Sequence, residues 1–200
     1  MTTGSIDERA GQRSSWHVGV RIVATLIDLA CMLPWIGVVA AAGAVLYTTG
    51  VTRSVDDVTG NIVGFFTVIV PITIAAAGFD ESARHATPGK RVLRLRVLSA
   101  PGGPGFSRAL LRNGLKYGFA WELAHTAVFA MVGTTTTTPV WVIVVLVAAY
   151  AIPLVSLGLL LTTGRPLHDR IARTSVAEIV PDTGPQTQPA RAPFSGSASA

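Results

Sequence analysis

Cysteine and charge are both scarce in this chain of 200 residues. Cys31 is its only cysteine, so no disulfide can form within the chain, and a lone thiol does not identify the cellular compartment. Charged residues account for 14% of the chain, whereas half of it is hydrophobic, and the mean hydropathy is +0.51. Few soluble domains have such a composition, which therefore favours a membrane protein.

Charge is missing altogether from three long stretches of the sequence. These stretches hold 24, 22 and 42 residues and cover 29–52, 58–79 and 123–164. About 20 apolar residues span the hydrocarbon core of a bilayer, so the first two stretches each predict one membrane helix. The third stretch is long enough for two helices, and the Thr-rich segment 133–139, which ends in Pro, predicts the turn between them.

We therefore expect an all-α membrane protein with four transmembrane helices, a basic cytoplasmic face and a short two-stranded element. The expected spans are 18–47, 61–79, 115–132 and 140–162, within one domain at 16–180. No small-residue cleavage site follows the first apolar run, so we interpret it as a retained helix and not as a signal peptide. Residues 1–15 are polar without periodicity, and 181–200 are rich in Pro, Ser, Gly, Ala and Gln. Both ends are therefore expected to be flexible cytoplasmic tails.

The positions of the basic residues agree with this count of spans. Lys and Arg number three up to the start of the first span, then one, eight and none in the successive connections, and four in the tail. Fifteen of the sixteen thus fall on one side of a four-span protein, and the positive-inside rule makes that side the cytoplasm. The net charge of +5 follows membrane topology and indicates no nucleic-acid partner. Fourteen Arg against two Lys suit a GC-rich bacterium, so the plasma membrane of a bacterium is the expected location.

The basic segment between the second and third spans carries the clearest signals of local structure. Thr87-Pro-Gly-Lys90 indicates a turn or a helix start, and it lacks the eight-residue glycine pattern of a phosphate-binding loop. Residues 93–98 alternate in hydrophobicity and predict a strand, which we expect to pair with the strand-like segment 174–180. The eight basic residues here are expected to meet anionic lipid headgroups, at about 1 kcal/mol for each residue near the surface.

Two charged residues stand in the first span, seven positions apart. Arg21 lies at its threshold, and Asp28 lies inside the apolar run, almost two turns further along the same helix face. A carboxylate in the membrane is costly unless it is protonated, paired, or facing water or protein, so other helices should pack around this face. One interpretation is an ion or proton site in the cytoplasmic half of the membrane. The other is a structural anchor, and the sequence leaves both open.

A second pair, Glu122 and His125, shares one face of the expected third span. Because His titrates near neutral pH, this pair suggests a proton relay, with a position near the membrane interface as the alternative. No further His is placed convincingly beside it, so we expect no metal site, and nothing indicates a cofactor. The chain has no Ser-His-Asp or Cys-His arrangement that would indicate an enzyme, so no catalytic residue is assigned.

Four short motifs, in this order, resemble the RDD family of small integral membrane proteins, which is named for one arginine and two aspartates. The matching positions are Arg21 and Asp28 in the first span, Thr87 to Lys90 before the expected strand, Arg112 and Asn113 after the Gly-rich turn, and 167–174 after the last span. The resemblance covers about 16–180 and implies that Asp169, between His168 and Arg170, is the second aspartate. One departure is Arg173, where the family commonly has Gly, and it affects the local turn.

The resemblance does not fix an activity, because sodium/proton antiport is reported for some members and membrane-complex assembly for others. The first hypothesis is cation/proton exchange, with Asp28 as the carboxylate, Arg21 tuning it and Asp169 as a gating or turn-holding residue. Four spans are few for alternating access within one chain, so transport would imply a homo-oligomer. The rival hypothesis is a non-transporting assembly or scaffold protein whose charged residues lock the bundle. Secondary candidates in either case are Lys90, Arg112, Asn113, Glu122, His125, His168 and Arg170.

Overall fold

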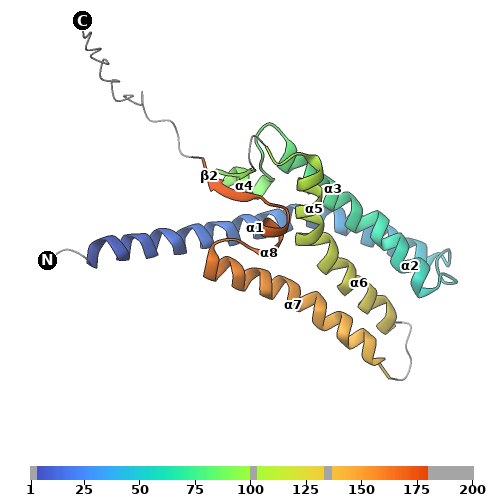
Figure 1. Ribbon diagram of the computed structural model, residues 1–200. Coiled ribbons are helices and arrows are strands. Elements are labelled where there is room, and N and C mark those ends of the chain that lie inside the picture. Colours follow the sequence, from blue (N-terminus) through green and yellow to red (C-terminus); the bar gives the residue numbers. More distant parts are fainter. Residues whose placement is uncertain (1–3, 100–102, 133–136, 180–200) are drawn as a thin grey trace, which may run out of the picture.

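The long helical segments of the chain lie side by side and alternate in direction (Figure 1). The computed structural model describes residues 4–99, 103–132 and 137–179. The long segments are α1 (Gly4–Thr48), then α2 (Asp57–Gly64) with the π-helix η1 (Phe65–Ile69) and α3 (Val70–Glu81), then α5 (Phe106–Asn113) with the π-helix η2 (Gly114–Gly118) and α6 (Phe119–Val132), and finally α7 (Val140–Thr163). The short elements α4 (Pro88–Val92), β1 (Leu95–Leu98), α8 (Leu167–Ile171) and β2 (Ser175–Glu178) gather at one end of these segments.

Three helical segments within the described ranges are long and apolar enough to cross a membrane. They are Val18–Thr48, Asp57–Glu81 and Val140–Thr163, and they overlap the expected first, second and fourth spans. The expected third span is not among them, because α6 has only 14 residues and the turns that precede it carry Arg112 and Lys116. The prediction of a membrane protein is therefore supported, while the count of four spans stays a prediction.

The structure differs from the sequence prediction at the start of α1. This helix begins at Gly4, so residues 4–15, which were expected to form a flexible tail, belong to the same helix as the first span. Its early turns include Glu8, Arg9, Ala10 and Gln12, which are strong helix formers and need no periodicity to extend a helix that is already nucleated. The predicted tail at 181–200 lies outside the described residues, as do parts of the two predicted turns, at 100–102 and 133–136.

Side-chain and glycine caps set the ends of the helices. Asp56 precedes α2, and its carboxylate accepts hydrogen bonds from the amides of Val58 and Thr59 at 3.1 and 3.0 Å, as an N-cap residue does. α7 ends at Gly164, whose φ of +68° is the left-handed conformation that glycine adopts without strain. Helix α5 begins at Phe106, directly after Gly105, whose φ of +69° is also left-handed.

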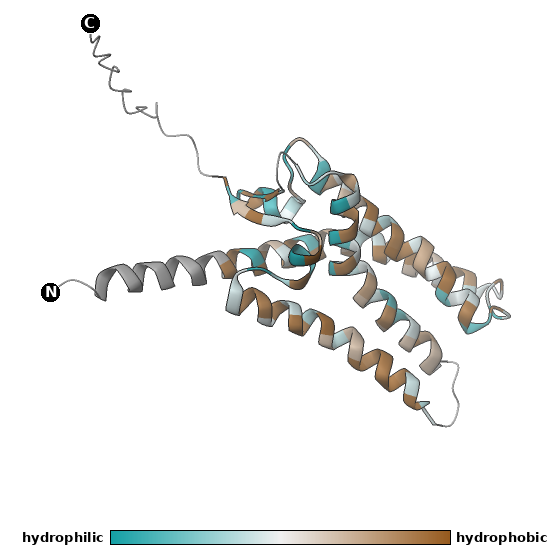
Figure 2. Ribbon diagram, in the orientation of Figure 1, coloured by the Kyte–Doolittle hydropathy of each residue, from teal (hydrophilic) through white to brown (hydrophobic). Residues whose placement is uncertain are grey.

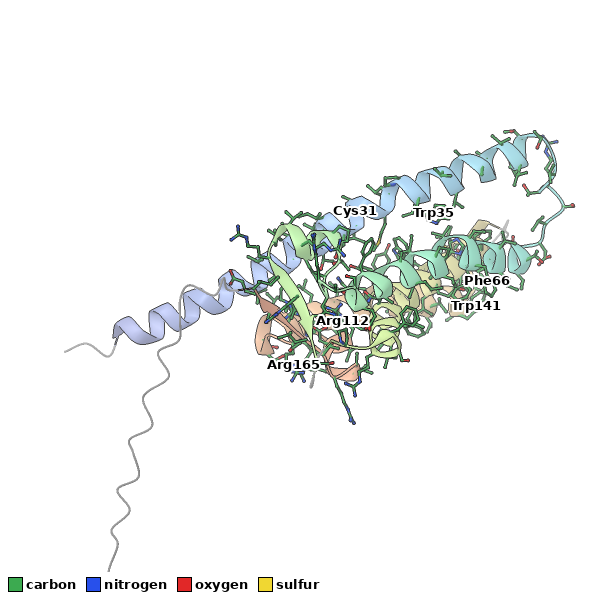
Figure 3. The ribbon with its side chains drawn as sticks, turned by 90° about the horizontal axis from the view of Figure 1, so that it is seen from above. Cys31, Trp35, Phe66, Arg112, Trp141 and Arg165 are labelled. Carbon is green, nitrogen blue, oxygen red and sulfur yellow. The ribbon has the colours of Figure 1, made fainter. Side chains whose placement is uncertain are left out.

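The π-helix η1 is followed closely by a proline, Pro71. Pro71 has no amide hydrogen, so the carbonyl of Thr67 four residues earlier loses its usual donor. The indole nitrogen of Trp35 on α1 donates to this carbonyl at 3.0 Å, and Figure 3 places Trp35 on the side of α1 that faces this helix. The missing amide hydrogen of Pro71 thus leaves the Thr67 carbonyl as an acceptor for Trp35, and this hydrogen bond joins the middle of α1 to η1.

The two predicted strand segments form an antiparallel pair, as expected. β1 pairs with β2 in the register Leu95 with Glu178 and Leu98 with Ser175. Leu95 and Val97 are buried while Arg96 between them is exposed, which is the period of two on which the strand prediction rested. The sheet ties the segment after α8 to the basic segment after α3.

Apolar and polar residues are segregated along the molecule. Brown, hydrophobic residues make up most of the long helices, whereas teal, hydrophilic residues gather where α4, α5, α8 and the sheet meet α1 (Figure 2). The outward side chains include Leu33 and Val144, with 63% and 61% of their surfaces exposed, which suits contact with lipid tails. The buried polar residues where α4, α5, α8 and the sheet meet α1 form the candidate site.

Candidate functional site

Arg112 is the centre of a buried cluster of charges. Its guanidinium donates from Nε to Asp169 Oδ1 at 2.6 Å and from Nη1 to Asp80 Oδ2 at 2.7 Å. Only 2% of the Arg112 side chain is exposed and none of either carboxylate. Burial opposes the charge on Arg112, but Asp169 and Asp80 outweigh it and raise the pKa of the guanidinium above its ordinary value. Arg112 therefore joins α3 to α8 through two charge-assisted hydrogen bonds.

Asp80, at the end of α3, holds two further side chains. The ammonium of Lys90 on α4 donates to its Oδ1 at 2.5 Å, and the amide of Asn113 on α5 donates to its Oδ2 at 2.9 Å. Burial, reinforced by Arg112, lowers the pKa of Lys90 to about 8, although Asp80 acts in the opposite direction. Lys90 is thus still mostly charged at pH 7, and every charge around Asp80 has an opposite partner.

Asp169, in α8, pairs with the first helix of the chain. Arg21 on α1 donates to Asp169 Oδ2 and, through its other terminal nitrogen, to the carbonyl of Gly164 at 2.7 Å. Burial alone would raise the pKa of Asp169, but Arg112 and Arg21 hold it well below its usual range. We define the charged cluster as Arg21, Asp80, Lys90, Arg112 and Asp169. Figure 3 shows Arg112 where ribbon from both halves of the chain comes together.

The two neighbours of Asp169 have different surroundings. His168 is buried, and burial followed by the charge of Arg112 lowers its pKa to about 3. The imidazole is therefore neutral at pH 7, and its Nδ1 lies 3.3 Å from the hydroxyl of Ser156 on α7. Arg170 lies outside the cluster and binds the hydroxyl of Thr163 at 2.6 Å. Arg170 therefore braces the turn after α7.

Asp28 does not pair with Arg21, so the structure contradicts the expectation that Arg21 tunes it. The Asp28 carboxylate accepts from the hydroxyl of Thr87 at 2.7 Å and from the amide of Gly89 at 2.8 Å, and only 2% of the residue is exposed. A Cβ at position 89 would lie 2.1 Å from the carbonyl oxygen of Ala24, so this contact requires glycine. Asp28 therefore anchors α4 against α1 through neutral donors.

Glu122 and His125 belong to a second, separate group of polar residues. Asn61 on α2 donates to Glu122 at 3.1 Å and to Thr126 at 3.0 Å, and its oxygen lies 2.9 Å from Nδ1 of His125. We call these four residues the polar cluster. The expected relay would have to pass through the amide of Asn61, which does not exchange protons near neutral pH. This geometry does not support the proton relay.

Among the residues that the structure describes, no group of three or more His, Cys, Asp or Glu side chains is arranged to hold a metal ion. Cys31 is exposed on α1.

The sequence analysis missed several residues that the structure brings to the site. Asp80 is fully buried and central to the charged cluster, yet it was not among the predicted site residues. It is the first charged residue after an uncharged run, and the connection that follows it carries eight basic residues. This pattern indicates an acidic residue that pairs with basic residues inside the protein. Thr87 and Gly89 were noted as a turn but not as the donors to Asp28. Nothing in the sequence indicated that Lys116 and Tyr117 belong to a site, because the π-helix η2, which sets the directions of their side chains, was not predicted.

The candidates Arg21, Lys90, Arg112, Asn113 and Asp169 thus meet at one site, with Asp28 close by. A family model described as the RDD family matches residues 17–173. Searches of the curated proteins and of the solved structures found no match. The matched range contains the charged cluster, the Asp28 contact and the polar cluster, and it covers more than three quarters of the sequence. The chain therefore belongs to the RDD family of membrane proteins.

Proposed function

We propose that this protein is a non-catalytic assembly protein of the bacterial plasma membrane, with four spans and both termini in the cytoplasm. The alternating direction of α1, α2–α3, α5–α6 and α7 supports this topology. It brings the charged cluster and the sheet to the side that carries fifteen of the sixteen Lys and Arg residues. On this side the exposed arginines face anionic headgroups and the acidic segments of partner proteins.

The observation that carries the proposal is the contrast between internal charges that are paired with one another and external arginines that have no carboxylate partner in the described part of the chain. Inside, the carboxylates of Asp28, Asp80 and Asp169 each accept at least two hydrogen bonds. Carboxylates with such partners are poorly suited to bind and release a cation in each cycle of transport. Arg112 is the hub of this fixed arrangement, which supports a rigid platform.

Outside, a basic hollow lies beside the sheet. It has a volume of about 550 Å³, and its arginines are Arg84, Arg91, Arg94 and Arg96. None of these four forms an ion pair with a carboxylate of the described residues. Arg guanidinium groups bind carboxylates in a bidentate fashion, so an acidic protein segment is the partner chemistry that this hollow fits.

Substitution of the exposed arginines by glutamine tests the proposal without disturbing the charged cluster. The double variant Arg94→Gln with Arg96→Gln should lose the proteins that co-purify with wild type in mild detergent. Arg53→Gln, which removes an exposed arginine at the opposite end of the bundle, is the matched control and should retain them. Equal recovery of partners by both variants, or a wild type that co-purifies with none, would contradict the assembly function.

A second candidate function, cation/proton exchange through an oligomer, is favoured by one observation. Asp28 is a buried carboxylate with only neutral donors, and it lines a cavity of about 330 Å³ between α1 and α3. Such a carboxylate is a candidate for protonation within the membrane. Proteoliposomes carrying a proton gradient separate the two functions. Exchange requires that sodium dissipates the gradient and that Asp28→Asn abolishes this effect at unchanged abundance, whereas the assembly function predicts no sodium-dependent flux.

A further inference from the structure

A second cavity, separate from the one that Asp28 lines, combines apolar walls with a basic floor. Its volume is about 350 Å³, and it lies between α1, the η2–α6 segment and α7. The walls include Leu29, Trp121, Ile152 and Leu157. The floor carries the side chains of four basic residues, Arg21, Lys90, Arg112 and Lys116. The cavity is thus amphipathic, with a hydrophobic part and a cationic part.

Lys116 differs from the other basic residues of this floor. Arg21, Lys90 and Arg112 each bind a carboxylate of the charged cluster. The Lys116 ammonium donates to the hydroxyl of Tyr117 at 2.6 Å and lies 4.5 Å from the centre of the same ring. No carboxylate in the described part of the chain lies within ion-pair distance of it. The floor therefore presents an amino group that has no carboxylate partner in the described part of the chain.

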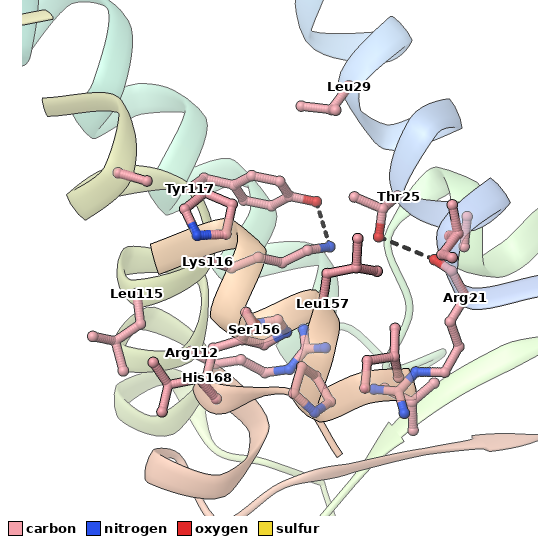
Figure 4. A pocket seen from close by; sticks show the side chains of 18 of the residues that line it. Arg21, Thr25, Leu29, Arg112, Leu115, Lys116, Tyr117, Ser156, Leu157 and His168 are labelled. Atoms are coloured by element: carbon pink, nitrogen blue, oxygen red, sulfur yellow. Dashed lines mark hydrogen bonds between the residues drawn. The ribbon is translucent and has the colours of Figure 1, made fainter. Parts of the chain in front are cut away.

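The π-helix η2 carries two neighbouring polar side chains to the cavity. Lys116 and Tyr117 both lie in η2 and both line the cavity. Figure 4 shows the two side chains reaching from η2 toward α1, where Thr25 and Arg21 lie opposite. The hydroxyl hydrogen of Tyr117 is left free to donate, because its oxygen is the acceptor for Lys116.

The depth of the cavity matches the headgroup end of the expected spans. Arg21 lies three residues after Val18, where the first candidate span begins, and Leu157 lies six residues before Thr163, where the last one ends. At 1.5 Å per residue these positions are about 5 and 9 Å inside the span ends. A lipid of the adjoining leaflet has its phosphate and the first part of its acyl chains at this level.

We propose that this cavity binds an anionic phospholipid, with the headgroup phosphate on Lys116 and Tyr117 and an acyl chain along the apolar walls. The proposal goes beyond the assembly function and does not depend on it, since the basic hollow and this cavity share no exposed arginine. A free phosphate ion would satisfy Lys116 equally well. It would leave the apolar walls without a partner, whereas a lipid fills both parts of the cavity.

Lipid binding to purified, delipidated protein in mild detergent tests the proposal, with native mass spectrometry as the readout. Wild type should retain one phosphatidylglycerol per chain in preference to phosphatidylcholine with the same acyl chains. Lys116→Met should weaken the retention of phosphatidylglycerol about ten-fold, because a charge-assisted hydrogen bond is lost. Lys116→Arg should preserve it. Arg108→Gln removes an exposed arginine of α5 and should leave it unchanged.

A steric variant keeps the test independent of the stability of Lys116→Met. Ala120 lines the cavity, so Ala120→Phe should narrow it and reduce lipid retention while Lys116 stays in place. Equal retention of both lipids by wild type, or full retention of phosphatidylglycerol by Lys116→Met or by Ala120→Phe, would overturn the proposal. An excess of inorganic phosphate that displaces the lipid completely would also overturn it and would make free phosphate the ligand. None of these results bears on the pull-down that tests the assembly function.

Discussion

The charged cluster and the polar cluster both bury hydrophilic side chains between helices, but they connect very different parts of the chain. The charged cluster draws on α1, α3, α4, α5 and α8, and its three best-buried members have 2% or less of their surfaces exposed. The polar cluster joins only α2 and α6 through Asn61. Arg21 and Asp169 are 148 positions apart, whereas Asn61 and Thr126 are 65 apart.

This difference indicates what each cluster contributes. Ions buried in pairs make a modest net contribution to stability, but removal of one partner leaves an uncompensated charge, which is costly. The charges of the charged cluster are all paired only when α1, α3, α4, α5 and α8 are in place together. The cluster therefore stabilises the fold only as a whole. The polar cluster sets the contact of two helices, helped by Gly60 and Gly64, where a Cβ would collide with the rings of Phe129 and His125. Loss of the polar cluster should therefore reduce the stability of the protein less than loss of the charged cluster.

The largest effect is expected for Asp80→Asn, which leaves Lys90 and Arg112 with one carboxylate too few. We expect a loss of about 3–5 kcal/mol in the free energy of unfolding, because the remaining charges are buried. Thermal unfolding of the detergent-solubilised protein measures this change. Asp57→Asn, at an exposed position of α2, is the control and should unfold as wild type does. An Asp80→Asn protein with wild-type stability would remove the distinction between the clusters.

The stability of the protein should also depend on pH through His168, which lies beside the charged cluster. Its pKa is about 3 in the folded protein and about 6.5 in the unfolded chain. Between these values the unfolded state binds one proton more, so stability is fully present above pH 6.5 and falls as the pH is lowered. From pH 7 to pH 5 the loss should be about 2 kcal/mol, measured by denaturant unfolding at each pH. His168→Gln should lack this part of the dependence, and an identical pH profile for the two proteins would refute the assignment.

A smaller effect is expected in the polar cluster. Asn61→Ala removes the donor to Glu122 and Thr126 and the partner of His125. Hydrogen bonds between membrane helices contribute about 0.6 kcal/mol each on average, so we expect a loss of about 1–2 kcal/mol in the same unfolding experiment. A loss as large as that of Asp80→Asn would show that both clusters hold the fold to the same degree.

The smallest effect, and a stabilising one, is expected at Arg173. Its φ of +54° lies in the left-handed region, in the turn that leads from Asp169 to Thr174. A non-glycine residue is strained there, so Arg173→Gly should raise the melting temperature slightly, by an amount equivalent to about 0.5–1 kcal/mol. A lower melting temperature for Arg173→Gly would mean that contacts of the Arg173 side chain outweigh the strain of its backbone.

The sequence predicted features that depend on local patterns. Uncharged runs located the three candidate spans, and alternation located the strands at 93–98 and 174–180, whose pairing the structure confirms. The sequence analysis also offered Asp169 as a turn-holding residue, and its carboxylate accepts from the hydroxyl of Thr174 in that turn. These inferences succeeded because periodicity and charge balance are properties of the chain itself.

Partner choice within the site could not be predicted in the same way. Arg21 and Asp28 share a helix face, and this made them look like partners. Their real contacts, Asp169 for Arg21 and Thr87 with Gly89 for Asp28, come from segments more than 55 positions away. Nothing in a single sequence ranks Asp28 above Asp169 as the acceptor for Arg21. Only the tertiary packing, which brings α4 to Asp28 and α8 to Arg21, decides it.

The most direct test of the account is a double-mutant cycle on Arg21 and Asp169. Unfolding free energies of Arg21→Gln, Asp169→Asn and the double variant should reveal a coupling of about 2 kcal/mol or more, since the partners share a buried ion pair. The cycle of Arg21 with Glu122, which lies in the polar cluster, should be additive within about 0.5 kcal/mol. Additivity between Arg21 and Asp169 would contradict the claim that a buried charge pair joins the first helix to the last.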